Sequence, residues 1–119
     1  MRAIPELNRN FKIYNSKIVL DNNSWWPTVT WNEVTKIGNL VIINFRGLYT
    51  SSLPKSGGIG TLPEGFRPKK DFALPSTFLG PSDEMYIGDI VIHSNGYITF
   101  GVSVSGQARW VTTYAVFSV

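Results

Sequence analysis

The dipeptide Asn95-Gly96 lies between two stretches in which apolar and polar residues alternate. The apolar positions, at every second residue on either side, are Ile90, Ile92, Ile98, Phe100, Val102 and Val104. Alternation with a period of two is the pattern of a strand that buries one face. Asn-Gly between two such stretches is the strongest short-range signal of a β-hairpin. The sequence therefore predicts an antiparallel hairpin at this point.

Other stretches rich in β-branched and aromatic residues are bounded by turn residues, which is typical of short strands. Strands are predicted at Thr28–Asn32, Leu40–Tyr49, Ile87–His93 and Arg109–Val119, with one or two short edge strands between Phe11 and Leu20. Gly38-Asn39 is a two-residue turn signal before Leu40–Tyr49, in which Val41, Ile43 and Phe45 share one face. The many prolines and glycines between Thr50 and Pro81 argue against a long regular element there. Apolar residues recur at helical spacing nowhere over more than about two turns. The pattern predicts an all-β fold, an antiparallel β-sandwich or jelly roll of about eight short strands.

The chain has 119 residues, which fits one domain with one hydrophobic core. Its first residues are polar and contain Pro5, so residues 1–10 are expected to be an arm or linker. Residues 11–119 are then expected to form a single β-sandwich domain.

Charge and hydropathy exclude several classes of protein. The net charge of +3 comes from 11 basic and 8 acidic residues, and only Lys69 and Lys70 are adjacent, whereas nucleic-acid binding needs clustered basic residues. The longest apolar stretch, Leu40–Ile43, is too short for a membrane span, and Met1–Tyr14 shows no signal-peptide pattern. We expect a soluble domain without nucleic-acid binding or membrane insertion.

Residues for catalysis or metal binding are sparse. There is no cysteine, and the only close acidic pair, Asp83 and Glu84, falls in a predicted loop. The sole histidine, His93, is opposite in parity to Ile90 and Ile92, so it is expected to face solvent or a subunit interface without partners for a triad or a metal site. The sequence predicts no enzyme, no cofactor and no resident metal. Two alternatives remain open, a metal held by three His93 copies on an oligomer axis and a small glycan-degrading enzyme.

Aromatic residues are the one feature that suggests a ligand site. Trp25 and Trp26 follow a polar turn cluster, and Tyr49 and Tyr86 lie at the ends of predicted strands. Exposed Trp and Tyr rings stack on the apolar faces of sugars, and loops on a β scaffold often carry function. These four residues are therefore candidate ligand-binding residues. In the alternative interpretation, the tryptophans fill the end of the sandwich or a subunit interface.

The segment Ile59–Pro68 contains a turn motif made of Gly60, Pro63, Gly65, Phe66, Arg67 and Pro68. Pro63 fixes one backbone angle, Gly65 permits a positive φ, Phe66 can be buried, Arg67 is expected to anchor a carbonyl or carboxylate, and Pro68 ends the turn in extended form. With the strands that precede and follow it, this segment resembles the C-terminal domains of tail, baseplate and tail-fibre proteins from phages of Gram-positive bacteria.

The resemblance implies a compact β-sandwich that forms a homotrimer in the virion, at the tail or baseplate. It implies a structural and assembly domain of the host-recognition device, which docks receptor-binding proteins and other phage baseplate proteins. The alternative in the same family is a receptor-recognition head that binds host cell-wall saccharide through surface aromatics. An exposed apolar patch, or uncharged strand faces around a three-fold axis, would be the mark of the assembly domain.

Overall fold

The computed structural model describes residues 12–22, 25–49, 54–80, 82–102 and 110–119. Within these ranges the chain forms nine strands and no helix, so the all-β prediction is confirmed, with nine strands in place of about eight. The strands are β1 (Ile13–Ser16), β2 (Val19–Leu20), β3 (Thr28–Ile37), β4 (Leu40–Leu48), β5 (Ser56–Thr61), β6 (Phe72–Leu79), β7 (Met85–Ile92), β8 (Tyr97–Val102) and β9 (Trp110–Ser118). The arm predicted for residues 1–10 lies outside the described residues.

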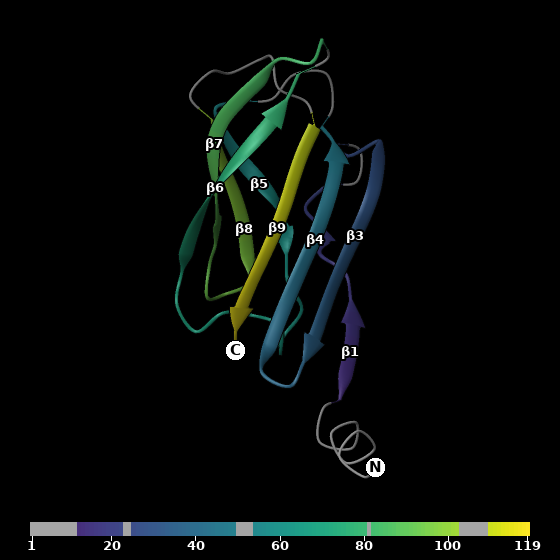
Figure 1. The fold of residues 1–119 in the computed structure, drawn as a ribbon, viewed down its shortest axis with the longest axis vertical. Helices are drawn as coiled ribbons and strands as arrows, with labels where there is room; N and C mark the ends of the chain where they lie inside the picture. The colour runs from purple at the N-terminus through teal and green to yellow at the C-terminus, as the bar shows by residue number, and fades with distance from the viewer. Residues whose placement is uncertain (1–11, 23–24, 50–53, 81, 103–109) are drawn as a thin grey trace, which may run out of the picture.

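One curled antiparallel sheet forms both layers of the sandwich. Its strand order is β1-β3-β4-β9-β6-β7-β8-β5-β2. We call β1-β3-β4-β9 the front sheet, which faces the viewer in Figure 1, and β6-β7-β8-β5-β2 the back sheet. The sheets are joined at one corner, where Phe78 and Leu79 of β6 pair with Val111 and Trp110 of β9.

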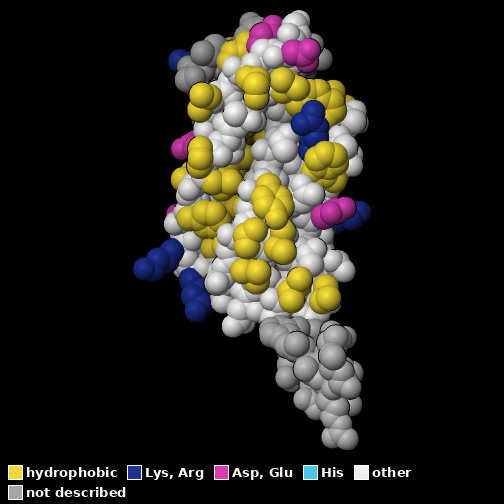
Figure 2. All heavy atoms as spheres, viewed as in Figure 1, with side chains coloured by type: hydrophobic (Ala, Val, Ile, Leu, Met, Phe, Trp, Pro, Cys, Tyr) yellow, Lys and Arg dark blue, Asp and Glu magenta, His cyan; other side chains and the backbone are white. Residues whose placement is uncertain are grey.

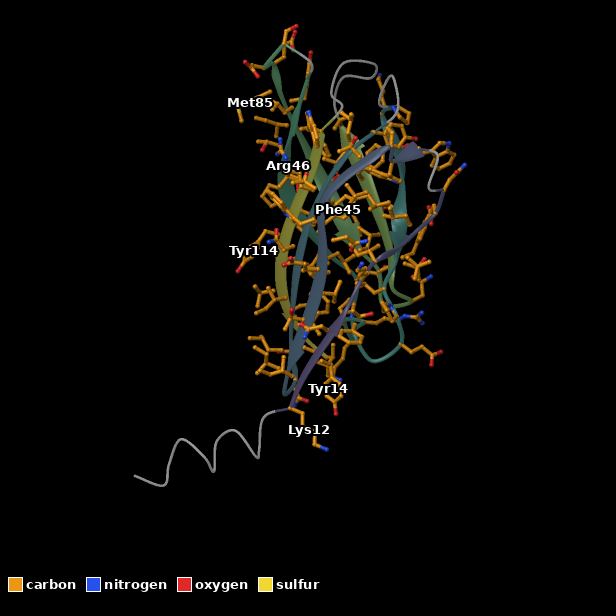
Figure 3. All side chains as sticks on the ribbon, turned by 90° about the vertical axis from the view of Figure 1, so that its right-hand side faces the viewer. Lys12, Tyr14, Phe45, Arg46, Met85 and Tyr114 are labelled. Carbon is orange, nitrogen blue, oxygen red and sulfur yellow. The ribbon has the colours of Figure 1, made fainter. Side chains whose placement is uncertain are left out.

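The core lies between the two sheets and follows from the alternation in the sequence. Val41, Ile43 and Phe45 on β4 share one buried face, as the sequence predicts. They meet the buried face of β8, where Phe100 packs against Phe78 of β6 with ring centroids 6.1 Å apart. Figure 3 shows Phe45 directed into this interior.

Both predicted glycine turns are hairpins. Gly38 has a φ of 59° at the first position of the two-residue turn between β3 and β4, as a type II′ turn requires. The β7–β8 hairpin has a three-residue loop, since the N–H of Gly96 donates to the carbonyl of His93 at 2.8 Å and the N–H of His93 donates to that of Tyr97 at 2.9 Å. Gly96 alone in this loop has a positive φ, of 91°, so the Asn-Gly pair forms a turn followed by a glycine bulge.

The prediction that prolines and glycines exclude a long element between Thr50 and Pro81 is wrong for β6, which has 8 residues and contains Pro75. Pro75 pairs with Asp89 of β7 on one side, while β9 pairs with β6 only at Phe78 and Leu79. Proline is compatible with a strand where its missing N–H faces an unpaired side. Pro75 therefore marks a part of β6 that is a sheet edge.

The turn motif fastens the connection between β5 and β6 to the β7–β8 hairpin. Leu62 donates its N–H to the carbonyl of Gly96 at 2.8 Å, and the Nε of Arg67 donates to the carbonyl of Leu62 at 2.9 Å. Gly65 has a φ of 89°, and Pro68 is buried. The predicted roles of Gly65 and Arg67 are confirmed, while Phe66 is half-buried against the core. Gly60 allows the close approach of β2, because a Cβ there would collide with the carbonyl oxygen of Val19.

Thr113, on the inner face of β9, is the one buried polar residue among those described, and its hydroxyl has no hydrogen-bond partner. A buried hydroxyl without a partner costs free energy that an apolar group of the same shape avoids. We expect Thr113→Val to raise the free energy of unfolding by about 1 kcal/mol, measured by urea denaturation. Thr112→Val is the control, because the Thr112 hydroxyl accepts a hydrogen bond from Arg46 at 2.9 Å. A Thr113→Val protein no more stable than wild type would contradict the prediction.

Candidate functional site

The candidate ligand-binding tryptophans lie in different environments. Trp26 is only 4% exposed, and its ring packs edge-on against Phe45 and Tyr49, with centroids 5.3 and 5.2 Å away. Trp25, its neighbour in sequence, is 40% exposed and tilts toward Tyr49 at 6.2 Å. Trp26 thus fills the end of the sandwich, as in the structural alternative, and offers no free ring face to a ligand.

The two candidate tyrosines are half-buried against the core. Tyr49 also contacts Phe100, with ring centroids 6.0 Å apart, and burial raises the pKa of its phenol. Tyr86 lies on β7 opposite Phe78 and joins none of the described ring contacts of Trp25, Trp26 and Tyr49. The structure therefore brings three of the four candidates together, but only Trp25 has a substantially exposed ring. The alternative of a carbohydrate-binding head rests on that residue.

His93 has partners, which corrects the prediction that it stands alone. Its Nδ1 lies 3.1 Å from Oδ2 of Asp71, and its Nε2 lies 3.2 Å from Oγ1 of Thr99. The other oxygen of Asp71 accepts the N–H of Ser94 at 2.7 Å, and the ring of Tyr97 stacks on the imidazole at 6.4 Å. The position of His93 in the alternation predicted that its side chain points outward. Its contact with Asp71 depends on the position of β6, which the sequence did not predict.

The Thr99 hydroxyl, the His93 imidazole and the Asp71 carboxylate are linked in the order found in a hydrolytic triad. In such a triad the carboxylate is buried and hydrogen-bonded to the imidazole. The side chains of His93 and Asp71 are 32% and 56% exposed, on the outer side of the back sheet. The contacts tie the residue before β6 to the β7–β8 hairpin.

The pH dependence of stability tests this tie. The hydrogen bond from the Ser94 N–H, and then the contact with His93, lower the pKa of Asp71 below its ordinary 3.8. A carboxylate with a lowered pKa in the folded state stabilises the fold above its unfolded pKa, and this contribution is lost as the pH falls through the folded pKa. We expect Asp71→Asn to lower the urea midpoint at pH 7, and the difference from wild type to shrink below about pH 4. The control is Asp83→Asn, an exposed residue with a φ of 65° that asparagine tolerates. A difference that persists undiminished to pH 2 would contradict the prediction.

The most extensive candidate surface is the side of the front sheet that faces away from the core, which we call the outer face. Register places on it the alternate side chains of β3, β4 and β9. Trp31, Leu40, Tyr114 and Val116 are 37%, 42%, 63% and 46% exposed there. Figure 2 shows hydrophobic side chains along the whole length of this face. Half-buried apolar residues lie between them, namely Ile37, Ile42, Leu48 and Trp110.

Charge is scarce on the outer face. Glu33 and Arg46 are the charged side chains that the described residues of β3, β4 and β9 direct to it. Arg46 lies over the ring of Trp110, 4.7 Å from its centroid. The apolar surface continues around the corner onto β7, where Met85 and Ile87 are 68% and 73% exposed, and Figure 3 shows Met85, Arg46 and Tyr114 on the same side.

Comparison with protein-family models and with curated proteins finds no match for this chain. In the described ranges there is no helix that meets the length and hydropathy of a membrane span. The same ranges contain no group of three or more His, Cys, Asp or Glu side chains placed to hold a metal ion. The outer face, the Trp25 region and the Asp71–His93–Thr99 cluster are thus the candidate functional surfaces of the described residues.

Proposed function

We propose that this protein is a structural and assembly domain of a phage tail baseplate, which forms a homotrimer in the virion and docks receptor-binding proteins. The apolar outer face carries the proposal, because it is the mark expected of an assembly domain. The resemblance of the Gly60–Pro68 motif and its flanking strands supplies the phage context. Binding, and not catalysis, is the activity proposed.

The number of exposed apolar side chains on one surface supports self-association. Exposed contiguous apolar patches on monomers rarely exceed a few hundred Å², and larger ones mark interaction sites. The outer face and its continuation at Met85 and Ile87 expose six large apolar side chains, each by more than a third. A standard stable interface buries about 800 Å² on each partner. Packing this face against further copies removes the apolar surface from water, which is the main favourable term in association.

The mass of the protein in solution tests the proposal. We expect a trimer by analytical ultracentrifugation, and we expect Leu40→Glu to shift the protein toward monomer, because the new carboxylate is desolvated in the contact. Val19→Glu is the matched control, since Val19 is 65% exposed but lies on β2 in the back sheet. A wild-type protein that stays monomeric at high concentration would refute the homotrimer.

A further inference from the structure

Among the described strands, the front sheet ends in two edges without a neighbour. β9 pairs with β4 along its whole length, but on its other side only Trp110 and Val111 pair with β6. No described strand pairs with that side of β9 from Thr112 to Ser118. At the opposite end of the sheet, β1 pairs with β3, and no described strand pairs with its other side. Each edge therefore presents backbone donors and acceptors for a further strand.

The other sheet edges carry features that oppose pairing. Proteins protect free edges by short strands, prolines, bulges and charged residues. In the back sheet, β2 has only 2 residues and the open part of β6 contains Pro75. The part of β3 that β1 leaves uncovered contains the bulge between Val29 and Trp31 and the charge of Glu33. By contrast, Ile13–Ser16 and Thr112–Ser118 contain neither a proline nor a charged residue.

Strand direction makes these two edges compatible with each other. Neighbouring strands in β1-β3-β4-β9 are all antiparallel, so β1 and β9 run in opposite directions. When a second copy extends the sheet in the same orientation, its β1 meets β9 as an antiparallel pair. Such a head-to-tail contact closes into a ring when the rotation between copies allows it.

We infer that β9 of one copy pairs with β1 of the next, so that three front sheets join edge to edge around a common axis. The inference rests on the proposed homotrimer and names its contact. The outer faces then turn toward the axis, and Tyr114, Val116 and Leu40 are removed from water together. Ile13, which is 63% exposed on β1, enters the same interior. The ring accounts both for the unprotected edges and for the apolar face between them.

The absence of cysteine from the chain allows a test by disulfide trapping. Asn15→Cys on β1 is combined in turn with Thr112→Cys, Tyr114→Cys and Val116→Cys on β9, all on the outer face. Within one chain β1 and β9 are three strand spacings apart, about 14 Å. A disulfide needs Cα atoms within about 7 Å, so any bridge between these positions joins two chains. We expect at least one double variant to give a covalent trimer on a non-reducing gel, and the single variants to give none.

Val19→Cys with Val116→Cys is the matched control, because both residues are exposed but lie in different sheets. It is expected to stay uncrosslinked. A trimer in solution without a crosslink in any double variant would overturn the edge pairing and leave the proposed function standing. A monomer in solution would overturn both. A covalent dimer from Val116→Cys alone would show that β9 pairs with β9, which also overturns the inference.

Discussion

Replacing Phe45 by alanine is expected to lower the free energy of unfolding by about 3–5 kcal/mol. Phe45 is fully buried in the middle of β4, and the ring of Trp26 packs edge-on against it. Gly47, two residues further on the same face, leaves the space that Trp26 occupies, because a Cβ there would lie 2.8 Å from its ring. Truncation at Phe45 thus removes the ring against which Trp26 packs, and Trp26 closes this end of the core.

Urea denaturation followed by tryptophan fluorescence measures the effect, since Trp26 changes environment on unfolding. Val19→Ala is the control, because Val19 is 65% exposed on β2 in the back sheet, away from the outer face, and its truncation should change stability by no more than about 0.5 kcal/mol. A loss at Phe45 of similar size to that of the control would show that the core relaxes around the missing ring.

Replacing Asn32 by alanine is expected to cost about 1–3 kcal/mol, although the residue is only half-buried. The side chain of Asn32 bonds both backbone groups of Ile18: its Oδ1 accepts the N–H at 2.8 Å, and its Nδ2 donates to the carbonyl at 2.9 Å. Ile18 lies where the chain crosses from β1 in the front sheet to β2 in the back sheet. Alanine leaves these backbone groups without their partners at a buried residue.

Hydrogen exchange gives a readout specific to this contact, because the amide of Ile18 should exchange much faster in Asn32→Ala while the amides of β8 keep their relative protection. Asn15→Ala is the control, since Asn15 makes an exposed hydrogen bond with Thr35. Unchanged protection of Ile18 would mean that the backbone pairs of β1 and β2 alone hold the crossing.

The parts of the fold that alternation determines could be predicted from the sequence. The alternation around Phe45 and Phe100 identified the core strands, and the glycines at 38 and 96 identified both hairpins. The prediction drawn from Pro75 was wrong. The free-energy cost of a proline in a strand depends on whether its N–H side has a neighbouring strand, which is a property of the whole sheet. The contacts of Asn32 with Ile18 and of Asp71 with His93 join residues distant in sequence, and no local pattern marks them.

The candidate site was harder to predict than the fold. Trp25 and Trp26 are adjacent in sequence, yet Trp25 is exposed and Trp26 is buried, because the Trp26 ring occupies the space that Gly47 leaves open. The outer face was missed as a particular surface, because Ile42 and Val116 are as apolar as the residues that fill the core. When both faces of a strand are apolar, the sequence does not show which face is buried, because burial depends on the second sheet and on other chains.

The corner at which β6 meets β9 also bears on synthesis of the chain. β9 completes the front sheet and makes the only strand pairing between the two sheets in the described chain. Its contact with β4 spans a long interval, as in the bond between Arg46 and Thr112, which are 66 residues apart. A nascent chain therefore has to emerge from the ribosome beyond Val111 before the two sheets can pair at this corner. Pairing between residues so distant in sequence slows folding. The apolar faces of the earlier strands therefore stay exposed in a partly folded chain until β9 is available.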